Sequence, residues 1–224
     1  MPFTLKHIAT CDSTNRAVLE YAPNTVLWAD SQTKGRGRRG HSWESKKGDG
    51  LYFSIFLKEK AESSLPLLVS VAILKALESL GARDIFLKWP NDIFYKESKI
   101  GGVLVEQTPK GCVIGIGINL KTPKLENAEY AISSLSEIFE NLPESEKIIA
   151  AILNEIAQCL AQGFEKNKDF WESHALWRGK NVQLTTESGI FAGNFCGVDF
   201  QGALHLSNFN QPFFSGSLRC PSSV

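Results

Sequence analysis

The sequence of 224 residues lacks a charge excess of either sign, a long apolar run and any clustering of cysteine. Its 24 Lys and Arg residues match its 24 Asp and Glu residues, and this balance argues against a general binder of polyanions. No stretch approaches the roughly 20 apolar residues of a membrane-spanning helix. Residues 1–15 have neither the apolar region of a signal peptide nor an arginine-rich amphipathic presequence, so we expect a cytoplasmic protein with no membrane partner.

Cysteine and histidine are sparse, and their spacing argues against several kinds of site. The five cysteines are scattered without a CxxC pair: Cys11, Cys112, Cys159, Cys196 and Cys220. The four histidines lack the spacing of metal ligands: His7, His41, His174 and His205. These patterns predict reduced thiols and no zinc site. Because the sequence also has no GxSxG motif and no evident Cys–His pair, a hydrolase with a covalent enzyme intermediate is poorly supported.

Apolar periodicity predicts an α+β protein in two parts. We expect helices over 12–23, 65–81, 143–167 and 169–179. We expect strands over 25–30, 51–58, 84–89 and 112–120, and a hairpin over 92–108. From Lys180 onward, short strands separated by Gly and Asn turns replace this pattern. The sequence therefore predicts one domain over 1–179 and a small β domain over 180–224.

A basic, glycine-rich loop, TKGRGRRGHSW, covers residues 33–43. Glycine lets the backbone approach a ligand closely, and arginine offers paired donors to carboxylate or phosphate oxygens. Trp43, near the end of the loop, could stack on a planar base. The loop does not match the GxxxxGK(S/T) pattern of a phosphate-binding P-loop. From these residues alone, a solvated or RNA-contacting loop explains the arginines about as well as a small-anion site does.

Polar side chains also follow Pro90 in KWPND, residues 88–92. Proline ends the strand, so Asn91 and Asp92 are expected at the rim of the sheet. Their oxygens could meet a hydrated cation there, or they could simply form a turn.

Two later stretches pair glycines with single polar residues. In SKIGGVLVE, Lys99 precedes Gly101 and Gly102, which thin the sheet and let a lysine reach an anion. An exposed hairpin lysine is the plainer alternative. The GIGINL stretch has Gly115 and Gly117 but neither the third glycine nor the following helix of a dinucleotide-binding fingerprint. The two glycines are better explained as leaving space for a ligand on one face of the sheet.

Four sequence blocks follow one another along the chain: DSTN, QTKGRGRRGHSW, KWPNDI with SKIGGVLVE, and GIGINL. Together they resemble the biotin protein ligases, also called biotin–acetyl-CoA-carboxylase ligases, over roughly residues 8–120. The resemblance implies a mixed β-sheet flanked by helices, of the class II synthetase type, followed by a small SH3-like barrel. It also implies an enzyme that uses ATP and Mg²⁺ to activate biotin as biotinyl-5′-AMP. Biotin would then pass to one lysine of the biotin carboxyl carrier protein of acetyl-CoA carboxylase.

The resemblance also implies roles for individual positions. Lys99 and Arg38 would be catalytic, facing the carboxylate and phosphate oxygens. The implied biotin-binding residues are Ser13, Thr14, Asn15, Gln32, Gly35, Arg36, Gly37, Arg38, Lys99, Gly101, Gly102, Gly115 and Gly117. The implied ATP- or adenylate-binding residues are Arg38, Trp43, Asn91, Lys99 and Asn119. Asp92 is the candidate metal ligand. The basic loop would be flexible without ligand and would close over biotinyl-AMP to exclude water.

The sequence departs from the family pattern at its start, where the ligase blocks begin by residue 12. We therefore expect a monofunctional ligase without an N-terminal DNA-binding domain, and no DNA partner. His41 stands where the family loop often carries another basic residue. Residues 121–132 should face the adenosine, although they do not align residue by residue, and Arg219 is a further nucleotide-site candidate. The resemblance leaves the oligomeric state open, because both homodimers and monomers occur in the family.

Two other functions stay open from the sequence. A lipoate–protein ligase or octanoyl transferase would share the catalytic fold, although GRGRRG with KWPND is not expected in either. An octanoyl transferase needs a nucleophilic cysteine, and Cys11 and Cys112 have no evident activating partner. The other alternative is a non-enzymatic RNA-binding module, which the neutral net charge disfavours.

Overall fold

The large sheet of the protein is mixed and seven-stranded. The structure, a computed structural model, describes residues 3–123 and 130–221. The strands are β1 (Thr4–Cys11), β2 (Thr25–Gln32), β3 (Gly50–Leu57), β4 (Ile85–Lys88), β5 (Asp92–Tyr95), β6 (Ser98–Thr108) and β7 (Gly111–Asn119). Their order is β1-β2-β3-β7-β6-β5-β4. β1 and β2 pair in parallel and the other neighbours are antiparallel, which confirms the predicted mixed sheet.

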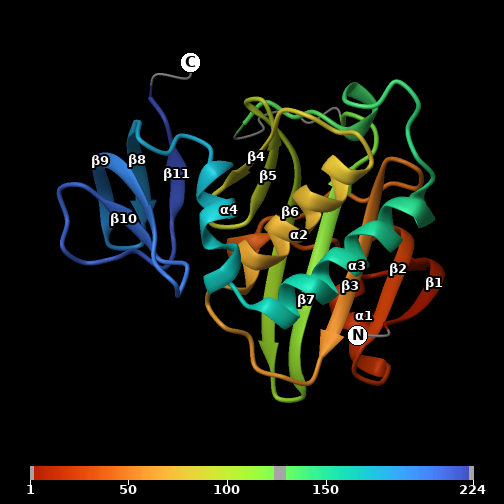
Figure 1. Ribbon diagram of the computed structural model, residues 1–224. Coiled ribbons are helices and arrows are strands. Elements are labelled where there is room, and N and C mark those ends of the chain that lie inside the picture. The colour runs from red at the N-terminus through yellow and green to blue at the C-terminus, as the bar shows by residue number, and fades with distance from the viewer. Residues whose placement is uncertain (1–2, 124–129, 222–224) are drawn as a thin grey trace.

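The two long α-helices lie across one face of this sheet (Figure 1). The α-helices are α1 (Thr14–Ala17), α2 (Leu65–Ser79), α3 (Ser145–Gln162) and α4 (Lys168–Ser173). Short 3-10 helices are η1 (Val18–Glu20), η2 (Arg38–Gly40), η3 (Leu135–Glu137) and η4 (Glu165–Asn167). α2 and α3 together bury most of the apolar side chains that their spacing predicted, and these join the main hydrophobic core.

The two faces of the large sheet differ because successive side chains of a strand point to opposite sides. On β7, Ile114, Ile116 and Ile118 belong to the core that α2 and α3 cover. The alternate positions are Gly115, Gly117 and Asn119. The helix-covered face is therefore filled with large aliphatic side chains, while the other face is left thin over β7.

A second sheet, called here the C-terminal sheet, is antiparallel and four-stranded. Its strands are β8 (Asn181–Thr186), β9 (Gly189–Val198), β10 (Leu204–Leu206) and β11 (Ser217–Arg219), in the order β10-β9-β8-β11. The first strand of this sheet begins at Asn181, one residue after the domain boundary expected between residues 179 and 180. The C-terminal sheet lies beside α4 in Figure 1. The small β-rich unit expected at the end of the chain is thus present.

The structure differs from the sequence-based expectations in three places. β1 was not predicted, because this edge strand is mostly exposed and lacks apolar alternation. The helix expected over 12–23 is shorter, with α1 passing into η1. The helix expected over 169–179 ends at Ser173, because the Leu87 N–H donates to the His174 carbonyl and the Leu176 N–H donates to the Leu87 carbonyl. Within the described residues, no helix is both long and apolar enough to cross a membrane.

Candidate active site

A cavity of about 460 Å³, called here the large cavity, lies on the thin face of the sheet. Its lining comes from α1, the basic loop, the strands β4 to β7 and the segment around Ser217. This volume is within the range of about 300–1,000 Å³ that is usual for small-molecule sites. Residues that are far apart in the sequence thus meet in one cavity.

One end of the cavity, called here the neutral end, is a network of amide and hydroxyl groups. The backbone N–H and the hydroxyl of Thr14 donate to Oε1 of Gln32, at 2.8 and 3.0 Å. The Ser54 hydroxyl, on β3, lies 2.7 Å from Thr14 Oγ1 and 2.6 Å from Asn15 Oδ1. Gln32 Nε2 in turn donates to Ser45 Oγ at 2.8 Å. The network fixes the orientation of these buried polar groups, because an unsatisfied one would be costly.

The β7 glycines make room for these side chains. A Cβ at Gly115 would come within 2.1 Å of Asn15 Oδ1, and one at Gly117 within 2.6 Å of the Trp43 ring. The space that the glycines leave is therefore occupied by Asn15 and Trp43, which in turn line the cavity.

The other end, called here the charged end, is built around Asp92 at the start of β5. Lys99 Nζ lies 2.6 Å from one carboxylate oxygen, and Lys88 Nζ lies 3.6 Å from the other. Burial alone would raise the pKa of Asp92, but the two lysines outweigh it and hold this pKa below its usual value. Lys88 is only 2% exposed, and its ammonium lies 4.5 Å from the centre of the Tyr130 ring. Asp92 is thus ionised and positions a lysine on either side.

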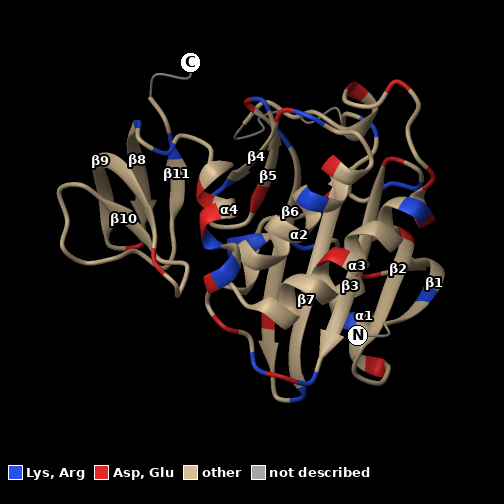
Figure 2. Ribbon diagram, in the orientation of Figure 1, with Lys and Arg blue, Asp and Glu red and all other residues tan. Residues whose placement is uncertain are grey.

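Arginines of the basic loop point to both ends. Arg38 Nη1 donates to Asn91 Oδ1 at 3.0 Å, which places its guanidinium at the charged end. Burial lowers the pKa of Arg38 from its ordinary value, although a guanidinium stays charged at neutral pH. Arg36 forms an ion pair of 2.9 Å with Glu106, whose carboxylate also accepts from Asn15 Nδ2 at 2.8 Å. In the ribbon of Figure 2, Lys and Arg residues and Asp and Glu residues are scattered over loops and helices.

Comparison of the chain with known proteins identifies its family. Residues 6–122 match the model of the biotin/lipoate A/B protein ligase family. The chain belongs to this family.

Individual members support the assignment. The chain is 32% identical over 219 residues to the bifunctional ligase/repressor BirA of Bacillus spizizenii, covering 87% of this chain and 66% of that protein. It thus spans just under two thirds of the length of this relative. It is 28% identical to a biotin–acetyl-CoA-carboxylase ligase of Paracoccus denitrificans, covering 89% and 92% of the two chains. The biotin protein ligase of Aquifex aeolicus in complex with biotin and ATP superimposes with a TM-score of 0.85 at 32% identity, over 97% of this chain and 99% of that one.

The structure brings nearly all of the sequence-predicted ligase residues to the cavity. Those that line it are Ser13, Thr14, Asn15, Gln32, Arg36, Gly37, Arg38, Trp43, Asn91, Asp92, Lys99, Gly102, Gly115, Gly117 and Asn119. Gly35 and Gly101 are not among the lining residues. A Cβ at Gly35 would lie 2.3 Å from the Trp43 carbonyl oxygen, and one at Gly101 would lie 2.8 Å from the Gly117 carbonyl oxygen. Both glycines thus permit close packing of the chain behind the site.

The expected adenosine-side segment over 121–132 is described only in part, because residues 124–129 lie outside the described residues. Pro123, Tyr130 and Ile132 line the cavity. The Lys99 N–H donates to the Ala131 carbonyl, so the end of this segment follows β6. Arg219 lies near the same place, with its guanidinium carbon 5.9 Å from the centre of the Tyr130 ring.

The residues around Asp92 indicate how the expected Mg²⁺ could be bound. Among the described residues, no group of three or more His, Cys, Asp or Glu side chains could hold an ion. The Asp92 carboxylate lies between two ammonium groups, which would repel a cation. Mg²⁺ characteristically binds to substrate phosphates with one or two carboxylates and several waters, so an ion carried by ATP fits this site better than one held by the protein alone.

Sequence reasoning missed several residues that complete the site. Ser54 and Glu106 tie the neutral end together, while Lys88, Tyr130 and Ser217 border the charged end. Lys88 stands in the KWPND block and could have been proposed from it. Ser54 lies outside the four blocks and Glu106 ends the SKIGGVLVE block, and only sheet register places the two beside Asn15.

Proposed function

We propose that the protein is an ATP-dependent biotin protein ligase. The observation that carries this proposal is a single cavity that joins a neutral hydrogen-bonding network to a cluster of cationic side chains. The substrate must then have a neutral polar head and an anionic tail, and it must react where negative charge gathers. Biotin has a neutral ureido ring with two donors and an acceptor, and its side chain ends in a carboxylate.

In the first step, a carboxylate oxygen of biotin attacks the α-phosphorus of ATP. The bond between the α-phosphorus and its bridging oxygen breaks, and pyrophosphate leaves with the electron pair. Lys99 and Arg38 would stabilise the charge that builds up on the carboxylate and α-phosphate oxygens. Mg²⁺ entering with ATP would neutralise the departing pyrophosphate.

In the second step, the neutral ε-amine of a carrier lysine attacks the acyl carbon of biotinyl-5′-AMP. An amide bond forms, the bond from the acyl carbon to the phosphate oxygen breaks, and AMP leaves while the amine loses a proton. Closure of the basic loop would protect the adenylate from water between the two steps. Trp43 would stack near adenine, and Asn91 and Asn119 would contact the nucleotide.

A lipoate–protein ligase of the same fold is the alternative, and the neutral end argues against it. The dithiolane ring of lipoate offers no strong hydrogen-bonding groups. A site lined with oriented, buried polar groups rejects a ligand that cannot pair with them, since those groups are then left unsatisfied. Thr14, Asn15 and Gln32 favour the ureido ring for this reason.

The decisive experiment mixes the purified protein with MgATP and either biotin or lipoate. Pyrophosphate release is followed, and the acyl-AMP is identified by mass spectrometry. We expect biotinyl-AMP from the wild type and its loss in both Lys99→Ala and Arg38→Ala. Lipoyl-AMP alone would assign the protein to lipoate activation, and the absence of both products would overturn the proposal.

The acceptor would be the biotin carboxyl carrier protein of acetyl-CoA carboxylase. The carrier domain is incubated with biotin, MgATP and the enzyme, and a biotinylated lysine is sought by mass spectrometry. Whether the protein forms a homodimer would be tested by light scattering at several protein concentrations.

A further inference from the structure

A second, smaller cavity, called here the interdomain recess, lies between the large sheet and the C-terminal sheet. Its volume is about 130 Å³. Its outer part is bounded by Pro66 and Leu67 of α2, Val105 of β6, and Gln201, Gly202 and Phe214 of the C-terminal part. The recess opens to the surface where Gln201 and Phe214 are exposed, and the Phe214 side chain is 55% exposed.

The recess and the large cavity share a wall. The residues that line both are Arg38, Pro90, Asn91, Val103 and Leu104. Two of these, Arg38 and Asn91, are joined by the hydrogen bond that forms part of the charged end. The inner end of the recess therefore borders the charged end of the large cavity, where carboxylate and phosphate oxygens would meet.

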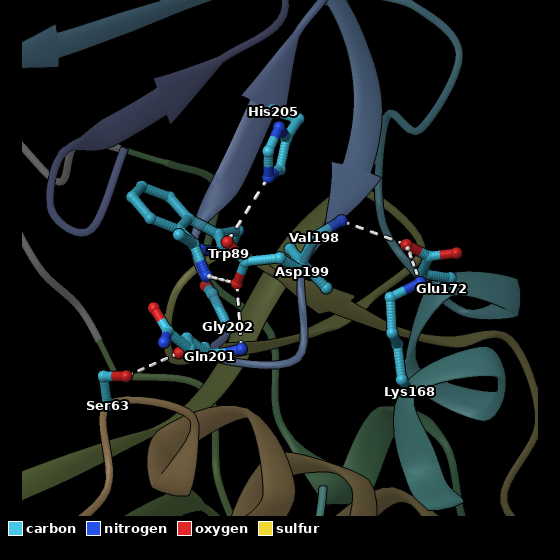
Figure 3. A network of polar contacts seen from close by, with 10 residues as sticks. Ser63, Trp89, Lys168, Glu172, Val198, Asp199, Gln201, Gly202 and His205 are labelled. Carbon is cyan, nitrogen blue, oxygen red and sulfur yellow. Dashed lines mark hydrogen bonds and ion pairs between the residues drawn. The ribbon is translucent and has the colours of Figure 1, made fainter. Parts of the chain in front are cut away.

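The outer wall of the recess is held in place by contacts between the two parts of the chain (Figure 3). The Trp89 indole N–H donates to the Gly202 carbonyl at 2.9 Å, and the Ser63 hydroxyl donates to the Gln201 carbonyl at 2.6 Å. Gly202 has a φ of +80°, and a Cβ there would come within 3.0 Å of Ser64 Cα, so the turn needs glycine to dock this closely. The outer wall is thus held by one buried hydrogen bond from Trp89 and one exposed hydrogen bond from Ser63.

We propose that the interdomain recess receives the acceptor lysine of the carrier domain, with Phe214 contacting the carrier surface around that lysine. This inference rests on the proposed ligase function. At about 130 Å³ the recess is smaller than usual small-molecule sites, which begin at about 300 Å³, so it suits a single side chain. Its outer walls combine apolar side chains from α2, β6 and Phe214, which suit the methylene stem of a lysine, with the polar Ser63 and Gln201, and its inner end is polar.

The charge at the inner end also suits a nucleophilic amine. Arg38 is a permanent cation, and a nearby like charge lowers the pKa of an incoming lysine. The neutral amine, which is the form that attacks an acyl carbon, is favoured there. The nucleophile would arrive through the recess while biotin and the nucleotide fill the large cavity, so the two would not compete for space.

The test narrows the mouth of the recess without touching the residues shared with the large cavity. Gln201→Trp is suitable because the interactions of this residue that fix the turn come from its backbone: its N–H donates to Asp199 Oδ1, and its carbonyl accepts from Ser63. Phe214→Ala instead removes the exposed contact surface. Ile190→Trp and Ile190→Ala are matched controls, because Ile190 is 64% exposed on β9 of the same sheet and is not a lining residue of the recess.

Three rates are measured for each variant: pyrophosphate release with biotin and MgATP, capture of enzyme-bound biotinyl-AMP by hydroxylamine, and biotinylation of a purified carrier domain. In both recess variants we expect kcat/KM for the carrier to fall about tenfold or more. Pyrophosphate release and hydroxylamine capture should stay within about twofold, as for the Ile190 controls.

Each other outcome has a definite meaning. Unchanged carrier biotinylation in both recess variants would overturn the proposal, and so would an equal loss in the Ile190 controls. An equal fall in hydroxylamine capture would make the recess a general solvent port and would also overturn it. If Gln201→Trp loses all three rates through misfolding, Phe214→Ala decides. Absence of biotinyl-AMP in the wild type would instead overturn the ligase function itself, which the first rate reports separately.

Discussion

The two ends of the large cavity hold their polar side chains in place by different interactions. At the neutral end, hydrogen bonds between uncharged groups fix Thr14 and Gln32, and Asn15 is held by Ser54 and by the Glu106 carboxylate. At the charged end, Asp92 holds Lys99 and Lys88 by ion pairing, and Arg38 joins them through Asn91. The comparison teaches that ligand orientation and ligand reactivity can be separated in one pocket. In the proposed ligase, neutral donors and acceptors would choose the head group, while cations would lower the barrier at the tail.

The largest effect is expected at the charged end. Lys99→Ala should lower the rate of biotinyl-AMP formation by about 10²–10³-fold, since an oriented cation at the developing charge is lost. Pyrophosphate release at saturating biotin and ATP measures this, and Lys58→Ala, at an exposed lysine, serves as the control. A loss that appears only as a higher KM for biotin would mean that Lys99 binds the head group and that the two ends are not separate.

Removing the charge of Asp92 should affect stability as well as activity. In Asp92→Asn, Lys88 keeps its charge in a buried position without its carboxylate, which should cost about 3 kcal/mol at pH 7. The Tm should then fall by roughly 10 °C. Thermal unfolding monitored by circular dichroism measures the change, and an unaltered Tm would contradict the role of Asp92 as the centre of the charged end.

The same variant should change the response to acid. The folded-state pKa of Asp92 lies below the ordinary value of 3.8, so its contribution to stability is fully present above about pH 3.8 and is lost as the pH falls further through the folded-state pKa. The wild type should lose this contribution in that acid range, whereas Asp92→Asn should lack that part of the pH dependence. Parallel slopes of unfolding free energy against pH would oppose this assignment.

At the neutral end we expect a loss of affinity without a loss of turnover. Thr14→Val removes the hydroxyl that links Gln32 to Ser54 and should raise the KM for biotin about tenfold, with kcat and the KM for ATP nearly unchanged. Thr10→Val is the matched control, because it removes a hydroxyl bonded to Ser31 on an edge strand that is not part of the cavity lining. A lower kcat in Thr14→Val would break the proposed division between the ends.

The smallest effect concerns the basic loop that connects the two ends. Trypsin should cut at the exposed Arg36 and Arg39 several times more slowly when biotin and MgATP are present, because the closed loop is withdrawn from the protease. Lys110, exposed in the β6–β7 turn, provides an internal reference site whose cleavage should not change. Equal cleavage of the loop with and without ligands would argue against its role as a lid.

The sequence was most informative where local pattern and fold agree. The helical spacing of α2 and the runs of β3 and β7 predicted these elements closely, because each has one face or both faces in the core. β1 escaped notice because an exposed edge strand is defined by its hydrogen-bonding partner and not by its own side chains. The helix expected over 169–179 was predicted too long, because pairing with Leu87 ends α4 at Ser173.

By itself the sequence determined the family, the chemical types in the site and the two structural parts, since motifs and periodicity are local properties of the chain. Only the tertiary structure decided that Gly115 makes room for Asn15, that Glu106 joins Arg36 to the neutral end, and that Lys88 is the second partner of Asp92. The interdomain recess belongs to the same group. Each depends on strand register or on the docking of two sheets, and contacts of that kind are set by packing between segments far apart in the chain.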